Sequence, residues 1–195
     1  MSAPPAPPLL LASRSPQRRA ILEQLGIPFD VVPPQWEEIA GGEPRETVRA
    51  NALGKARSVA RAAGERPVLG VDTEVVLDGH VFGKAESEAV AEAMLEALAG
   101  HTHEVVSGLC LITPGWEVVE HEVTRVTFRT LDARDLAAYV SFGEWEGRAG
   151  AYAVQGRGAA LVERIEGDYL NVVGLPVALL VRLLAERFAG VYGFG

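Results

Sequence analysis

The stretch LLLASRSPQRRAIL, residues 9–22, decides how the chain begins to fold. Its leucines and first alanine predict a short buried strand, and residues 13–15 predict a tight loop. Ser15 is a favourable N-cap and Pro16 suits the first helical position, so we expect a helix that ends near Gly26. The chain therefore starts with a strand, a loop and a helix that docks on a sheet.

Hydroxyl groups and cations gather where this helix is predicted to start. Arg14, Arg18 and Arg19 lie beside two serines, Ser13 and Ser15. A helix N-terminus disfavours each cation by about 0.3–1 kcal/mol, which an anionic ligand would offset. Free backbone N–H groups, hydroxyls and guanidinium groups together suit a phosphate or polyphosphate. The alternative is a basic turn that is solvated.

Length and composition indicate an ordinary globular protein. The 195 residues are 48% hydrophobic and 23% charged, which argues against disorder and suffices for a core. We expect residues 1–195 to form a single domain with two lobes. The net charge of −8 argues against binding nucleic acid through general electrostatics. A small polyanionic ligand would need a local basic site and a divalent cation to screen nearby carboxylates.

The sequence also predicts a cytoplasmic protein that contacts no membrane. Its one cysteine, Cys110, lies in an apolar run, so a buried thiol in a reducing compartment is expected. Residues 1–8 are proline-rich and lack the regions of a signal peptide. The apolar run at 172–181 contains Pro176 and is far shorter than the roughly 20 residues that span a bilayer.

Strand and helix patterns alternate along the chain, with an antiparallel section in the middle. Apolar or alternating runs predict strands at 9–12, 28–32, 67–71, 75–77, 81–84, 103–113, 117–131 and 159–165. Amphipathic runs predict helices at 16–26, 44–63, 86–98, 133–142 and 176–188. The predicted fold class is α/β with a mixed sheet.

Charged side chains outside the first loop could complete a phosphate site. Asp72 follows the buried strand 67–71, where an unpaired carboxylate is costly and therefore suggests a function. Glu38 lies in a loop, Lys55 on a helix and Lys84 after a hairpin. A solvated surface lysine is the ordinary interpretation of Lys55 by itself. Together these groups suit metal-assisted hydrolysis of a phosphoric anhydride, with cations neutralising phosphate and carboxylates holding an ion and accepting a proton.

Other hydrolytic chemistries lack their motifs. There is no Gly-x-Ser-x-Gly elbow and no Walker A loop, so the phosphate site must be of another kind. The histidines have no spacing typical of a metal site and are expected at the surface: His80, His101, His103 and His121.

Five ordered segments of the chain resemble a known family. They are LASRSPQRR (11–19), LGVDT (69–73), VFGK (81–84), AGAYAVQGRGA (149–159) and NVVGLP (171–176). Together they resemble the Maf family of nucleoside triphosphate pyrophosphatases over nearly the whole chain. The resemblance implies a strongly bent mixed sheet with two lobes around a cleft, as in Maf and ITPase-like folds, and often a homodimer.

The same resemblance implies an activity, a cofactor and a set of roles. The expected reaction is hydrolysis of the α–β phosphoanhydride of dTTP or UTP, with a divalent cation such as Mg²⁺ or Mn²⁺, and the family is also tied to septum formation. Asp72 would accept the proton and, with Glu38, hold the metal. The phosphate-side and substrate-binding residues would be Ser13, Ser15, Gln17, Arg18, Lys55 and Lys84, with Thr73 and Gln155 bearing on base choice.

Three positions depart from the family pattern. Gln17 replaces an arginine, Ala85 replaces a common proline, and Glu74 replaces an aliphatic residue and could be a spare ligand or a solvated edge residue. Gln155 lies in the glycine-rich stretch 147–159, which could be a pocket wall or simply a run of tight turns. Its amide could read a pyrimidine edge, which favours dTTP and UTP. Because Gln17 removes a charge near the position that the resemblance links to specificity, we expect this preference to be looser.

Two other functions are compatible with parts of the pattern. A nucleotide-binding regulator of septation could share the fold without turnover, and a small phosphatase could act on monoesters. A regulator could have lost its catalytic groups, but Asp72, Lys55 and Lys84 are all present. The sequence therefore favours the enzyme.

Overall fold

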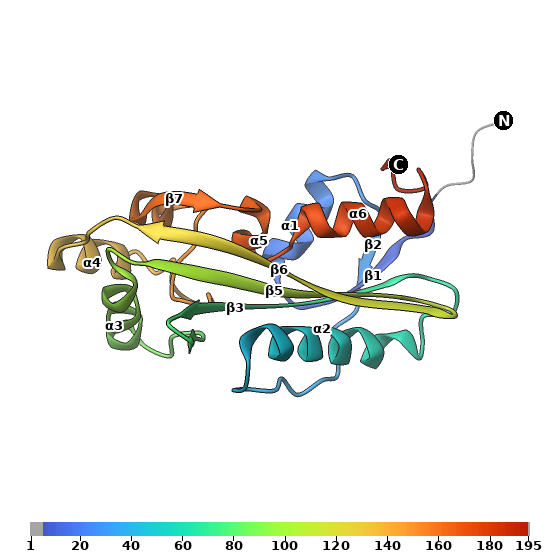
Figure 1. Ribbon diagram of the computed structural model, residues 1–195, viewed down its shortest axis with the longest axis horizontal. Coiled ribbons are helices and arrows are strands. Elements are labelled where there is room, and N and C mark those ends of the chain that lie inside the picture. Colours follow the sequence, from blue (N-terminus) through green and yellow to red (C-terminus); the bar gives the residue numbers. More distant parts are fainter. Residues whose placement is uncertain (1–5, 195) are drawn as a thin grey trace.

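The computed structural model describes residues 6–194, whose strands form one seven-stranded sheet with helices on both faces (Figure 1). The strands are β1 (Leu9–Ala12), β2 (Phe29–Val31), β3 (Val68–Leu77), β4 (His80–Phe82), β5 (Thr102–Thr113), β6 (Trp116–Phe128) and β7 (Val162–Glu166). The helices are α1 (Pro16–Gln24), α2 (Pro44–Ala60), α3 (Glu88–Leu98), α4 (Ala133–Val140), α5 (Tyr169–Val173) and α6 (Val177–Phe188), with a 3₁₀ helix at Arg157–Leu161.

The sheet is mixed. Its strand order is β2-β1-β3-β5-β6-β7, and β4 pairs with one end of β3. β1 runs parallel to both β2 and β3, whereas β3, β5, β6 and β7 are joined by antiparallel pairings. The predicted α/β class with a mixed sheet is therefore confirmed.

Alternate residues of β3 face opposite helical layers. Leu69 and Val71 pack with α1 and α6, whereas Val68 packs with α2. Figure 1 shows α2 on one side of the sheet and α1 and α6 on the other. Because side chains alternate along a strand, Asp72 points toward α2 and Thr73 toward α1. Two adjacent residues thus reach both layers.

Two glycines let α2 lie unusually close to the sheet. A Cβ at Gly70 would lie 2.2 Å from the backbone oxygen of Ala52, and a Cβ at Gly108 would lie 2.1 Å from that of Val48. A larger residue at either position would push the helix away, because the atoms in its path are backbone atoms. The close approach brings Lys55, on the same helix, within reach of β3.

Two large hydrophobic cores lie at opposite ends of the sheet. The α1/α6 core joins these helices to β1 and to one half of β3 and β5. The α3/α4 core joins α3 and α4 to the second half of β3 and β5 and to the end of β6. Figure 1 shows the long strands running from one end to the other. We call the two ends the α1/α6 lobe and the α3/α4 lobe.

An opening in the strand pairing separates the lobes along one edge of β3. β1 pairs with β3 as far as Gly70, and β4 pairs with β3 only from Val75 onward. Within the described residues, positions 71–74 have no strand beside them on that edge. The side chains of Asp72 and Thr73 are therefore accessible from a gap between the lobes rather than covered by a neighbouring strand.

One predicted strand is partly wrong. Residues 157–161 form a 3₁₀ helix, and the strand begins only at Val162. The Glu144 carboxylate accepts hydrogen bonds from the backbone N–H groups of Arg157 and Gly158, at 3.0 and 3.1 Å. This contact from a distant segment stabilises the turn, and sequence pattern alone could not predict it.

The single cysteine and the helix lengths can be compared with the expectations from the sequence. Cys110 is buried in β5, where burial raises the pKa of its thiol to about 12, as expected of a structural cysteine. Among the helices of residues 6–194, none combines the length and apolar character needed to cross a membrane.

Candidate active site

A cavity of about 370 Å³ lies at the gap between the lobes. All ten predicted site residues line it, although they come from distant parts of the chain: Ser13, Ser15, Gln17, Arg18, Glu38, Lys55, Asp72, Thr73, Lys84 and Gln155. The glycine-rich stretch contributes Gly147 and residues 148–149 and 152–155, so it does form a wall. The structure brings the predicted residues together, while their individual roles stay predictions.

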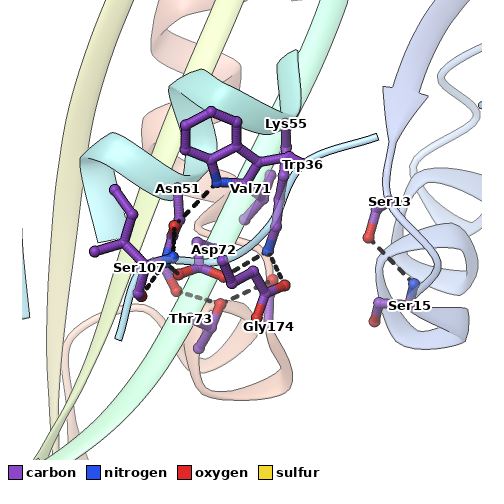
Figure 2. A network of polar contacts seen from close by, with 12 residues as sticks. Ser13, Ser15, Trp36, Asn51, Lys55, Val71, Asp72, Thr73, Ser107 and Gly174 are labelled. Atoms are coloured by element: carbon purple, nitrogen blue, oxygen red, sulfur yellow. Dashed lines mark hydrogen bonds and ion pairs between the residues drawn. The ribbon is translucent and has the colours of Figure 1, made fainter. Parts of the chain in front are cut away.

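The loop after β1 is held by its own serines. The Ser13 hydroxyl accepts a hydrogen bond from the Ser15 backbone N–H at 3.1 Å, as Figure 2 shows. The Ser15 hydroxyl accepts from the backbone of Arg18 and donates to Gln17 Oε1 at 3.0 Å. Ser15 is therefore the N-cap of α1, as predicted. Its bond to Gln17 fixes the amide at the position where the resemblance led us to expect an arginine.

Arg18 is buried and connects α1 with β3 and the turn before α6. Its guanidinium donates to the carbonyl oxygens of Gly174 and Val71, at 2.8 and 2.9 Å. It also donates to the hydroxyls of Ser13 and Thr73, at 3.2 and 3.1 Å. Burial lowers the pKa of Arg18, an effect that Asp72 and Glu38 partly offset. Four of its N–H groups thus bind the protein itself, so Arg18 orients both hydroxyls.

Lys55 joins two carboxylates at the base of the cavity. Its Nζ lies 2.6 Å from Asp72 Oδ1 and 2.6 Å from Glu38 Oε1. Lys55 is 6% exposed and Asp72 7% exposed, whereas the Glu38 side chain is 59% exposed. The surface-lysine interpretation of Lys55 is therefore wrong. Its ammonium compensates a carboxylate that would otherwise be buried without a counter-charge.

Glu74 lies two residues beyond Asp72 on the same face of β3. It is half-buried, and its Oε2 is buried without a hydrogen-bond partner in the structure. Burial, together with the charges of Asp72 and Glu38, raises the pKa of Glu74 to about 7, and Lys55 opposes this rise. Glu74 does not line the cavity. It is therefore not a freely solvated edge residue.

The donor set suits a hard divalent cation. Within residues 6–194, no group of three or more His, Cys, Asp and Glu side chains is arranged to hold a metal alone. Glu38 and Asp72 nevertheless converge on one cationic group, the ammonium of Lys55. Mg²⁺ is commonly held by one or two carboxylates together with substrate phosphates. The chemistry of these two carboxylates therefore fits an ion that phosphate oxygens would complete.

Lys84 and Gln155 belong to the α3/α4 lobe. Lys84 is exposed and follows β4, where it forms an isolated bridge with Ala149 of the glycine-rich stretch. Gln155 is exposed at the cavity wall, next to the buried Val154. Both side chains are free to turn toward a ligand in the cavity, whereas the groups of the α1/α6 lobe are already fixed by hydrogen bonds.

The sequence analysis expected all four histidines at the surface, which is wrong for His103, because it is 1% exposed. Its Nε2 lies 2.9 Å from the hydroxyl of Tyr152, and its ring packs edge-on against Phe128. His103 pairs across the sheet with the buried Val126. Alternation with Val105 could have revealed this inward position. Tyr152 lines the cavity as part of the predicted glycine-rich wall, and the sequence analysis missed that His103 supports it.

His103 is expected to make stability depend on pH. Burial lowers its pKa from 6.5 to about 4, so the folded protein keeps this imidazole neutral. As the pH falls through this window, the unfolded chain binds a proton that the folded chain excludes, and stability is lost. We expect a loss of about 2–3 kcal/mol between pH 7 and 4.5.

Urea unfolding of the wild type and of His103→Gln at both pH values measures how much His103 contributes to the pH dependence of stability. Glu74 has a raised pKa and acts in the opposite direction over part of the window. Subtracting the variant's pH dependence from that of the wild type isolates His103. Equal pH dependence in the two proteins would contradict the prediction.

Comparison with known proteins identifies the family of this chain. Residues 8–187 match the family model described as Maf-like protein. A protein named dTTP/UTP pyrophosphatase from Nitratidesulfovibrio vulgaris is 49% identical over 188 residues, covering 94% of this chain and 90% of the relative. Another of that name from Moorella thermoacetica is 47% identical over 189 residues, covering 95% and 97%. The chain therefore belongs to the Maf family.

Proposed function

We propose that this protein hydrolyses the α–β phosphoanhydride of dTTP and UTP, releasing the nucleoside monophosphate and pyrophosphate. The observation that carries the proposal is the Lys55-linked pair Asp72 and Glu38, which lines the same cavity as the serine loop and the start of α1. The names of the relatives give the nucleotides. The carboxylates suit activation of water, and the serine loop suits the phosphates.

The α1/α6 lobe would bind the polyphosphate. The hydroxyls of Ser13 and Thr73 are oriented by Arg18, and the start of α1 contributes a partial positive charge. Lys84 would approach from the other lobe because its ammonium is exposed at the cavity. These fixed donors would stabilise charge that develops on the leaving pyrophosphate.

Asp72 would act as the general base. Lys55 and Asn51 each hold one of its carboxylate oxygens, at 2.6 and 3.0 Å. A carboxylate fixed in this way can accept a proton from a water placed between it and the α-phosphorus. Glu38 is more exposed and lies on a loop, so it could adjust when the nucleotide enters.

A divalent cation, Mg²⁺ or Mn²⁺, would be held by Glu38 and Asp72 together with phosphate oxygens. The ion would screen the carboxylates from a substrate that carries about four negative charges. Exhaustive chelation is expected to abolish hydrolysis, and adding back Mg²⁺ or Mn²⁺ to restore it. Full activity after chelation would remove the cation from this proposal.

Gln155 is proposed to contribute to base recognition. Its amide offers one acceptor and two donors, which could pair with O4 and N3–H of uracil or thymine. Replacing it with alanine is expected to reduce the preference for UTP over CTP by about 5- to 150-fold in kcat/KM, since buried pairs of this kind contribute about 1–3 kcal/mol.

Rates with dTTP, UTP, CTP, GTP and 7-methyl-GTP test that prediction. Gln17→Arg restores the family's usual residue at a position that contacts Ser15 and is expected to sharpen selectivity. An unchanged ranking in Gln155→Ala, or a wild-type preference for 7-methyl-GTP, would contradict the assignment of the base to this wall.

Product analysis tests the function itself. Pyrophosphate and monophosphate in equal amounts from UTP are the expected products. Orthophosphate released from nucleotide monoesters would instead support a phosphatase, and tight binding without turnover would support a regulator of septation. The proposal extends to a cytoplasmic homodimer that binds no nucleic acid, which light scattering and a nucleic-acid binding assay would examine.

A further inference from the structure

The segment that carries Glu38 has no helix or strand of its own. Residues 32–43 join β2 to α2 and run beside α2, to which hydrogen bonds attach them. The Gln35 backbone N–H donates to Ser58 Oγ at 3.1 Å, near the end of α2. Thr47 Oγ1 donates to the Gly41 carbonyl at 2.8 Å, near its start. Between these two attachments, the segment depends on a third residue of α2.

That third residue is Asn51. Its Oδ1 accepts from the indole N–H of Trp36 at 3.1 Å and from the backbone N–H of Ile39 at 2.8 Å. Its Nδ2 donates to the Ile39 carbonyl at 3.0 Å. Trp36 packs directly on Gly54, where a Cβ would lie 2.2 Å from the ring. The backbone of Ile39, directly after Glu38, is therefore held by hydrogen bonds to the Asn51 side chain.

The same Nδ2 also donates to Asp72 Oδ2 at 3.0 Å. Asn51 is 1% exposed, so this amide is fully removed from water, and its oxygen and nitrogen each take part in two hydrogen bonds. Figure 2 shows Trp36, Asn51, Asp72 and Lys55 as one connected set of contacts. Lys55 links the two carboxylates through charge, and Asn51 links the Asp72 carboxylate to the backbone of Ile39 through hydrogen bonds.

We propose that Asn51 is a positioning residue that sets the placement of Glu38 relative to Asp72. This inference rests on the proposed function, because it assigns Asn51 to the carboxylate pair used there. Asn51 orients one oxygen of Asp72, which leaves Oδ1 for Lys55, and fixes Ile39, the neighbour of Glu38. Without Asn51 the exposed Glu38 would be held only by its contact with Lys55 and by the two distant attachments.

Asn51→Leu keeps the approximate volume and removes every one of these hydrogen bonds. We expect kcat for UTP to fall about 10- to 100-fold, as loss of a group that orients reacting residues commonly does. KM should change by less than about threefold, because no phosphate or base contact is removed. If the substitution lowered only the free energy of unfolding, kcat divided by the folded fraction would equal that of the wild type.

The indole N–H of Trp36 gives a second readout that does not depend on turnover. The chain has three tryptophans, so ¹⁵N–¹H spectra contain three indole signals, and Trp36→Phe assigns one of them. In Asn51→Leu this signal should shift, because its hydrogen bond is gone. If the leucine variant does not fold, Asn51→Ala is measured instead, with urea unfolding to establish the folded fraction.

Ser58→Ala is the matched control. It removes another attachment of the same segment to the same helix but has no contact with Asp72. Its kcat and its Trp36 signal should match the wild type. Wild-type kcat in a folded Asn51 variant, or an equal loss in Ser58→Ala, would overturn the inference. If the wild type releases no pyrophosphate from UTP, the proposed function fails. If it does and only the Asn51 variants keep wild-type kcat, this inference alone fails.

Discussion

Asp72→Asn is expected to reduce kcat for UTP by about 10²–10⁴-fold while nucleotide binding persists. The amide keeps the shape of the carboxylate but cannot accept a proton from water. Asp72 is buried, with one oxygen 2.6 Å from Lys55 Nζ and the other 3.0 Å from Asn51 Nδ2. In the variant the amide oxygen can still accept from Lys55, whereas Asn51 Nδ2 loses an acceptor, so a modest loss of stability is expected beside the loss of turnover.

Steady-state rates with Mg²⁺ or Mn²⁺, together with calorimetric titration of a non-hydrolysable UTP analogue, measure both parts of this prediction. Asp72→Glu is an informative control, because it keeps the proton acceptor but moves it by about one methylene. Turnover of Asp72→Asn at the wild-type rate would show that another group is the base.

Lys55→Met is expected to reduce both activity and stability. Its ammonium contacts Asp72 and Glu38 at 2.6 Å, and both Lys55 and Asp72 are largely buried. Removing one member of a buried ion pair leaves the other charge without compensation and typically costs about 3–5 kcal/mol. We expect about 3 kcal/mol here, since Asn51 still donates to Asp72 and Glu38 is solvated.

Urea unfolding at pH 7 measures the loss. The double variant Lys55→Met/Asp72→Asn removes both buried charges and should recover much of the stability without recovering activity. Lys84→Met is the control for loss of an exposed lysine and should unfold like the wild type. If Lys55→Met is as stable as the wild type, the buried pair does not stabilise the fold.

Local sequence signals were sufficient for the elements with strong periodicity. The strand, loop and helix of residues 9–22 follow from leucines, the N-cap Ser15 and the following proline, and the structure confirms them. Asp72 could be selected because a carboxylate directly after a buried apolar run is costly. Ser13, Ser15 and Arg18 could be selected because hydroxyls and cations gather at a helix start. The roles of the other site residues came from the resemblance to a family.

Features that depend on contacts between distant segments could not be predicted. The burial of Lys55 depends on Gly70 and Gly108, which lie far along the chain and let α2 approach the sheet. Asn51 looks like an ordinary polar helix residue until residues 32–43 are placed beside it. His103 carried a usable signal in strand alternation, which its polar chemistry outweighed.

The long central strands have a consequence for unfolding. β3 and β5 each contribute buried side chains to both the α1/α6 core and the α3/α4 core. Melting either core would therefore expose apolar parts of strands that the other core needs, and the lobes should lose their structure in one cooperative transition. We propose on this basis that they form a single domain.

Fluorescence of Trp145, in the α3/α4 core, and amide exchange in α6 should report the same free energy of unfolding. An active site at the seam of two lobes would then keep its two halves together for as long as the chain stays folded.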